Sequence, residues 1–163
     1  MLLNSNIAVI AFDPGVTTGV CVCEGVHFYS GSSFTVTYSA CLAWQDRRNI
    51  YYALQRLRAY EEAGDLYLNA IVIERFKLFA KEAQSQVGSE FPAVQVLARI
   101  EAYAELLGFE DRIHMLEPSV KGRVQILPQH KPQLDLSTEH TKDAYQLARY
   151  YITQHKPSLK KKR

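Results

Sequence analysis

The sequence predicts an α/β fold: a mixed five-stranded sheet, made of a three-stranded antiparallel meander and further parallel strands, flanked by helices. Residues 7–12 and 68–73 are near-continuous apolar runs, which are typical of strands buried on both faces of a sheet. Short, turn-rich links join the first three predicted strands, and such links connect antiparallel neighbours. A segment with helical periodicity precedes the second apolar run, so we expect that run to lie parallel to a strand of the meander.

Turn and cap signals set the bounds of the individual elements. Gly64 and Gly108 follow helical segments as C-terminal caps. Pro92 occupies a favoured first position of a helix, and Thr138 is an N-terminal cap. The predicted strands cover residues 6–13, 20–23, 26–36, 67–74 and 113–116. The predicted helices cover residues 41–63, 92 to about 107, 120–127, and a last segment from the Thr138 cap to about 154.

Length and composition indicate a single globular domain at residues 1–155 and a basic tail at residues 156–163, which we expect to be disordered. The chain has 163 residues, of which 47% are hydrophobic and 22% are charged. No apolar stretch approaches the ~18 residues of a membrane span, and no signal-type segment opens the chain. We therefore expect a cytoplasmic protein with no membrane partner and no small-molecule cofactor.

The net charge of +2 hides a contrast between the tail and the body of the chain. Five of the 19 basic residues lie in the tail, and the body has 14 basic residues against 17 acidic ones. The body is therefore not a general basic surface for nucleic acid. The tail is equally compatible with added affinity for phosphate and with a solubilising role.

Three cysteines without a C-x-x-C spacing indicate a reducing compartment. Cys21 and Cys23 share one face of a predicted strand. We expect them to be small core residues rather than metal ligands.

Each of the two apolar runs ends on an acid, Asp13 after the first and Glu74 after the second. Because a charge is costly inside a buried strand, these carboxylates belong where the strands emerge. If the two strands are neighbours, the acids share one sheet edge and form an anionic pocket that a cation would stabilise. Each acid alone is also compatible with a local role, Asp13 in the turn with Pro14 and Gly15, and Glu74 in a surface ion pair.

A third acid stands on the last predicted helix. His140 and Asp143 are three residues apart, so they face the same side, and apolar positions continue this face toward the core. An acid on such a face needs a partner. A favourable interaction with the helix dipole, worth roughly 0.3–1 kcal/mol, is the alternative explanation for Asp143. The conjunction with two strand-end acids favours a metal site.

Together these motifs resemble the RuvC family of Holliday junction resolvases, in particular its compact, phage-type members, within the ribonuclease H-like superfamily. The resemblance extends from residue 6 to about residue 152. Its segments are Ile10-Ala11-Phe12-Asp13-Pro14-Gly15 with Thr18-Gly19, then Val72-Ile73-Glu74, residues 92–101, residues 117–121, and His140-x-x-Asp143-Ala144. The resemblance implies a ribonuclease H-like sheet and a homodimer that binds a four-way DNA junction and nicks symmetry-related strands using Mg²⁺ or Mn²⁺. The helix at residues 92–107 is the expected dimer interface.

The resemblance carries Asp13, Glu74 and Asp143 over as acidic metal ligands, and His140 takes a position that is His or Asp in the family. These four are the predicted catalytic and metal-binding residues. The chemistry agrees, because two divalent cations about 3.5–4 Å apart can stabilise the attacking and leaving oxygens of a phosphodiester. A mostly oxygen ligand set favours Mg²⁺ or Mn²⁺, with two ions per active site.

Predicted DNA contacts begin directly after Glu74. Basic and aromatic side chains are interleaved there, which suits phosphate contact and base stacking at an unstacked junction. The resemblance implies that one aromatic residue of this segment, Phe76 or Phe79, probes the junction. Core packing of one Phe and solvated lysines explain the segment equally well. The predicted contacts are Arg75, Phe76, Lys77, Phe79, Lys81, Lys121, Arg123 and Lys142.

Three other functions share part of this pattern. A nuclease of the same superfamily that cuts flaps, branched DNA or structured RNA would have the same active site and differ in substrate. A non-catalytic junction-binding module would not need the complete acid set. An actin-like ATPase would need a second Asp-x-Gly loop and a second subdomain, for which the chain is too short.

Overall fold

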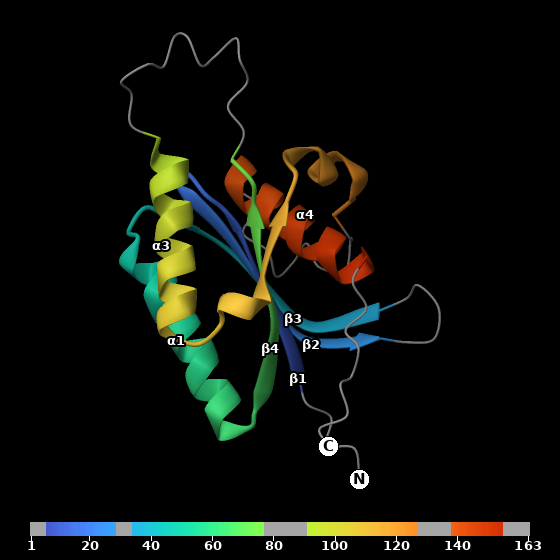
Figure 1. Ribbon diagram of the computed structural model, residues 1–163. Coiled ribbons are helices and arrows are strands. Elements are labelled where there is room, and N and C mark those ends of the chain that lie inside the picture. Colours follow the sequence, from blue (N-terminus) through green and yellow to red (C-terminus); the bar gives the residue numbers. More distant parts are fainter. Residues whose placement is uncertain (1–5, 29–33, 77–90, 127–137, 155–163) are drawn as a thin grey trace.

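Five strands form one mixed sheet with the order β3-β2-β1-β4-β5 (Figure 1). The structure is a computed structural model that describes residues 6–28, 34–76, 91–126 and 138–154. Its strands are β1 (Asn6–Asp13), β2 (Thr18–Phe28), β3 (Phe34–Trp44), β4 (Leu66–Glu74) and β5 (Ile113–Leu116). The first three strands pair in antiparallel, whereas β4 runs parallel to both β1 and β5. The predicted sheet is confirmed.

Helices cover both faces of the sheet. The α-helices are α1 (Arg48–Ala63), α3 (Pro92–Leu106) and α4 (Glu139–Gln154), and two short 3-10 helices are η2 (Glu110–Arg112) and η3 (Pro118–Arg123). Figure 1 shows α1 and α3 against one face and α4 against the other. Two cores result: Ile10 and Ile71 pack on the α1 and α3 side, and Val9 and Val72 on the α4 side. This double burial explains the near-continuous apolar runs of β1 and β4.

The predicted bounds of the second and third strands are wrong. The break between the strands predicted at residues 20–23 and 26–36 is not a turn, because Gly25 takes a φ of +64° and β2 continues past it. Glu24 pairs with Tyr38 and Val26 with Val36, on either side of Gly25. Residues 26–28 are therefore the end of β2 and residues 34–36 the start of β3, rather than parts of one strand.

Two predicted helices are also corrected. The helix expected at residues 41–63 begins at Arg48, because residues 41–44 pair with β2 as the end of β3. Pairing across the sheet overrides the helical spacing that these residues share with α1. The helix expected at residues 120–127 is instead the six-residue η3, after which the backbone is extended at Val124. Gly122 and the β-branched valines give this segment little helical propensity.

Other expectations hold. Gly64 and Gly108 have φ values of 81° and 73° just past α1 and α3, so the predicted C-terminal caps are confirmed. The three cysteines are buried and form no disulfide, consistent with core positions. Within the described ranges, no helix combines the length and the apolar character that crossing a membrane requires.

Candidate metal centre

The sheet brings Asp13 and Glu74 to the same edge. Asp13 is the last residue of β1 and Glu74 the last of β4, and these strands are parallel neighbours with Phe12 opposite Ile73. The apolar side chains that precede each acid fix both strands in the core. The acids therefore emerge side by side at the carboxyl ends of two central strands, where ligand sites of open α/β sheets are found.

The N-terminal half of α4 supplies the third acid, Asp143. Thr138 caps this helix, because its Oγ1 accepts a hydrogen bond from the Thr141 N–H at 3.2 Å. Buried Thr141 returns a hydrogen bond to the Thr138 carbonyl at 2.9 Å, which fixes the start of the helix. Gly19 of β2 lies directly beneath, and a Cβ there would overlap with the backbone carbonyl of His140. A glycine is thus required for α4 to approach the sheet this closely.

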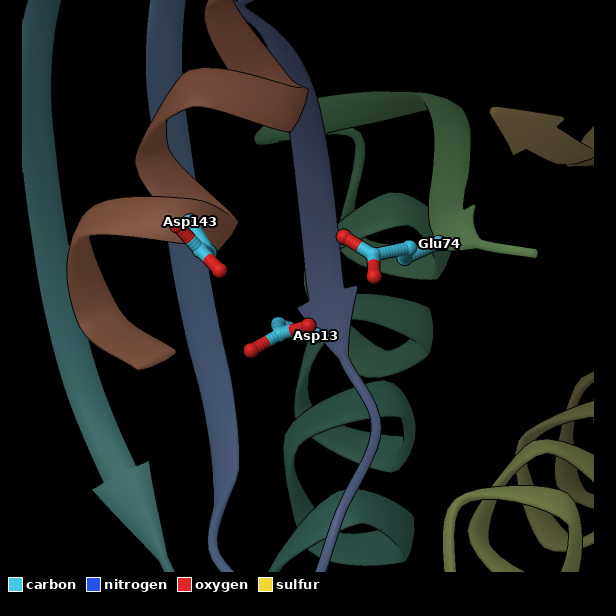
Figure 2. A group of neighbouring side chains, drawn as sticks. All are labelled: Asp13, Glu74 and Asp143. Atoms are coloured by element: carbon cyan, nitrogen blue, oxygen red, sulfur yellow. The ribbon is translucent and has the colours of Figure 1, made fainter. Parts of the chain in front are cut away.

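Asp13, Glu74 and Asp143 each place one carboxylate oxygen within 4.8 Å of the others. Figure 2 shows the three carboxylates converging from β1, β4 and α4. Burial is the largest influence on the first two acids: it raises the pKa of Asp13 and of Glu74 above their ordinary values, despite the opposing effect of nearby cationic or hydrogen-bonding groups. The cluster therefore concentrates negative charge in a partly desolvated place.

Lys121 of η3 reaches into this cluster. Its ammonium donates a hydrogen bond to Asp143 Oδ2 at 2.5 Å and forms an ion pair with Glu74 Oε2, also at 2.5 Å. Burial alone would lower the pKa of Lys121, but its contacts with Asp143 and Glu74 raise it above the ordinary value. Lys121 is thus a cation held between two of the three acids.

His140 contacts the remaining acid. Its Nδ1 lies 2.8 Å from Asp13 Oδ2, at hydrogen-bond distance. The Asp13 side chain is only 9% exposed, whereas that of His140 is 45% exposed. His140 therefore links the buried acid to the open side of the site, and the structure brings together all four residues predicted as catalytic.

The residues present fit a divalent cation. The three converging ligands are carboxylate oxygens, the type that Mg²⁺ and Mn²⁺ prefer. In addition, Glu74 Oε2 is buried and lies 2.5 Å from the Lys121 ammonium, so a cation already occupies a position beside it.

The predicted DNA contacts are spread around the site. Arg75 is exposed and pairs with Glu117 at 3.3 Å, and Lys142 pairs with Glu139 at 2.6 Å. Arg123 is exposed at the end of η3. These three remain at the surface, whereas Lys121 lies among the acids.

The segment after Glu74 is described only in part. The Phe76 ring packs against that of Phe91, with centroids 5.5 Å apart. Phe76 therefore contacts the residue that precedes α3. The predicted contacts Lys77, Phe79 and Lys81 lie outside the described residues.

Sequence reasoning missed how Lys121 is placed. The available signal was Pro118, which opens a short helical segment, followed by a lone lysine three residues later. Nothing in the local pattern shows that this segment folds back toward α4.

Comparisons with known proteins agree with the fold. No protein-family model matches the chain, and no curated protein matches it by sequence. Among solved structures, T. thermophilus RuvC in complex with Holliday junction substrate aligns with a TM-score of 0.52 and 16% identity, over 90% of this chain and 93% of that one. A Thermus thermophilus RuvC structure aligns with a TM-score of 0.52 and 15% identity, over 90% and 96%. The chain therefore shares its fold with these two RuvC structures, as its motifs indicated.

Proposed function

We propose that this protein is a metal-dependent endonuclease that resolves four-way (Holliday) DNA junctions by paired phosphodiester nicks. The convergence of Asp13, Glu74 and Asp143 at one sheet edge carries this proposal. The likeness of the fold to a RuvC structure in complex with a Holliday junction supports the choice of substrate. The alternative, a nuclease for flaps, other branched DNA or structured RNA, shares the site and differs only in substrate.

Asp13, Glu74 and Asp143 are the proposed ligands of two Mg²⁺ or Mn²⁺ ions, with His140 beside them. When bound, such ions stabilise the attacking and leaving oxygens of a phosphodiester. Asp13, on the central strand of the site, is the best placed of the three to be shared between two ions. Its hydrogen bond with His140 holds the carboxylate in one orientation.

His140 and Lys121 have distinct proposed roles. The exposed imidazole of His140 can accept a proton at the open side of the site, while its Nδ1 faces Asp13. Lys121 balances the charge of Glu74 and Asp143 and keeps both carboxylates turned inward. An ammonium beside a scissile phosphate would also favour the negative charge of the transition state.

The nucleic acid is proposed to lie over the open side of the acid cluster. Arg75, Arg123 and Lys142 are the proposed cations: Arg75 pairs with Glu117, Lys142 pairs with exposed Glu139, and Arg123 is exposed. Exposed ion pairs are weak, so a phosphate can replace the acid without a large penalty. Lys77, Phe79 and Lys81, which lie outside the described residues, stay proposed DNA contacts on the sequence alone.

A homodimer is proposed because two strands of a four-way junction must be cut in a related geometry. The candidate interface is α3, where Val94 and Leu106 are exposed at 41% and 71%. Light scattering at micromolar concentration, with and without junction DNA, tests this assembly. A monomer under both conditions would contradict it.

The test of function is a cleavage assay on a panel of four-way junctions, flaps, linear duplexes and structured RNA, with Mg²⁺ or Mn²⁺. We expect paired nicks in the four-way junction, and their loss in Asp13→Asn and in Glu74→Gln. Asp46→Asn is the matched control, because Asp46 is an exposed acid that pairs with Arg48 outside the cluster. Unchanged cutting by the Asp13 and Glu74 variants would contradict a role for the acids in catalysis, and preferential cutting of flaps or RNA would favour the alternative substrate.

A further inference from the structure

A polar cavity of about 510 Å³ lies between the end of η3 and the C-terminal half of α4. Arg123 and Gln125 line it from the η3 side, and Arg149, Thr153 and Gln154 from α4. Gln146 ties the two walls together, because its Nε2 donates a hydrogen bond to the Val124 carbonyl at 3.1 Å. Among the described residues, none that lines the cavity is acidic. Within that part of the chain, the charged groups of this pocket are the two arginines Arg123 and Arg149.

Arg149 is the unusual member of this pocket. Its Nε and Nη1 atoms are buried, and they donate to no acceptor among the described residues. A buried cationic donor without a partner is costly, and folded proteins rarely leave one in that state without a functional reason. Such a group gains most from an anion that can accept several hydrogen bonds at once.

The other lining groups suit the same ligand. Arg123 adds a second guanidinium at the exposed end of the pocket, and Gln125 and Gln154 add amide donors. Guanidinium groups match the geometry of phosphate oxygens, to which they can donate in pairs. Val124 and Tyr150 complete the wall with apolar surface that keeps the pocket in shape.

We propose that this pocket binds a backbone phosphate of the nucleic acid on which the acid cluster acts. The inference that this phosphate belongs to a nucleic acid rests on the proposed function. The inference that the pocket binds an anion rests on the pocket alone. The same two elements border both places: η3 carries Lys121 and Arg123, and α4 carries Asp143 and Arg149.

Six residues separate Asp143 from Arg149, which is about 9 Å of rise along α4 and about 240° of rotation around its axis. The pocket would therefore receive a phosphate that is displaced from the scissile one both along and around α4. Arg149 would thereby fix the register of the strand on the enzyme.

The experiment measures binding in chelator, so that cleavage does not enter the result. The wild type, Arg149→Gln, Arg149→Lys and Arg123→Gln are titrated with a labelled four-way junction and with a linear duplex over a range of salt concentrations. Arg58→Gln is the matched control, because Arg58 lies on α1 at the opposite face of the sheet and pairs with exposed Glu62. Thermal unfolding of every variant, with inorganic phosphate or with sodium chloride at equal ionic strength, forms the second arm.

We expect Arg149→Gln to weaken DNA binding on the order of tenfold and to reduce the slope of log K against log salt by about one. Arg149→Lys should recover part of the affinity and most of the slope. Arg58→Gln should bind as the wild type does. Phosphate should raise the melting temperature of the wild type but not that of Arg149→Gln, and Arg149→Gln alone should melt no lower than the wild type.

Three results would overturn the proposal. Equal DNA affinity and salt slope in Arg149→Gln and Arg58→Gln would remove Arg149 from the interface. Stabilisation by phosphate without any effect on DNA binding would assign the pocket to a free phosphate compound. A clear loss of thermal stability in Arg149→Gln would show that the guanidinium serves the fold. DNA binding is measured without metal. If the protein does not cut junctions, each of these three results therefore keeps its meaning for the pocket.

Discussion

The Nζ atom of Lys121 lies 2.5 Å from Glu74 Oε2 and 2.5 Å from Asp143 Oδ2. One ammonium thus occupies the space between carboxylates that belong to a strand and to a helix. A metal ion attracted by the same carboxylates has to share or displace this contact. Lys121 therefore couples the stability of the fold to the loading of the site.

Replacing Lys121 by Met should lower the free energy of unfolding in chelator by about 1–3 kcal/mol, because two partly buried acids lose their cation. Mg²⁺ or Mn²⁺ should then raise the melting temperature of the variant more than that of the wild type, since metal binding favours the folded state. Chemical denaturation with and without metal measures both effects. Lys142→Met, which removes an exposed ion pair with Glu139, should change stability by less than about 0.5 kcal/mol. Equal stability of Lys121→Met and wild type in chelator would show that the ammonium is not needed there.

Asp13→Asn should stabilise the metal-free protein while removing its activity. The substitution eliminates one charge from a cluster in which burial already disfavours ionisation, and the asparagine can still meet His140. We expect a rise in melting temperature of about 2–5 °C in chelator, as for a gain near 1 kcal/mol, and a loss of cleavage of at least about 100-fold. Calorimetry and the junction assay test the two halves separately. A lower melting temperature of Asp13→Asn than of the wild type would mean that the Asp13 carboxylate stabilises the metal-free fold.

Gly19→Ala should damage the fold and the site together. The added methyl group would overlap with the His140 carbonyl, and backbone cannot rotate out of the way as a side chain can. We expect a loss of at least about 3 kcal/mol in unfolding free energy, with displacement of the first turn of α4. Gly122→Ala is the control, because no atom lies within 4 Å of a Cβ at that position and the variant should be nearly neutral. Similar stabilities of the two variants would refute the tight approach of α4 to β2.

Thr138→Ala should cost about 1 kcal/mol through loss of the helix cap. The cap oxygen holds the Thr141 N–H, and the turn that it fixes carries His140 and Asp143. The rate of cleavage should therefore fall by more than the small loss of folded protein would explain. Thr138→Ser keeps the hydroxyl and should restore both properties, as measured by denaturation and by the rate of junction cutting. An alanine variant with wild-type cleavage would separate the cap from the alignment of the site.

Much of the site could be predicted because its acids stand where buried strands end. A charged residue after a long apolar run is expected where the strand leaves the core, because burying a charge is costly. This rule predicted the positions of Asp13 and Glu74 at the sheet edge. The spacing of His140 and Asp143 on an otherwise apolar helix face completed the set. The contact between Lys121 and two of these acids could not be predicted, because it depends on how η3 folds over α4 rather than on any local pattern.

The wrong predictions about the fold also concern residues whose structure depends on distant parts of the chain. Residues 41–44 match a helical spacing, yet they pair with β2, whose partner the local sequence does not name. Gly25 can adopt a positive φ, as turn residues do. Here β2 continues through Gly25 with a positive φ, and the chain does not reverse its direction. Where neighbours in the sequence determine the structure, as at Gly64, Gly108 and Thr138, prediction and structure agree.

His140 and Asp13 touch although 127 positions separate them in the chain. During synthesis β1 to β4 emerge long before α4, so the growing sheet carries Asp13 and Glu74 without Asp143. Metal ions can gather at that unfinished edge only weakly, because the full ligand set does not yet exist. The proposed cutting activity should therefore arise late in folding, when the last helix docks.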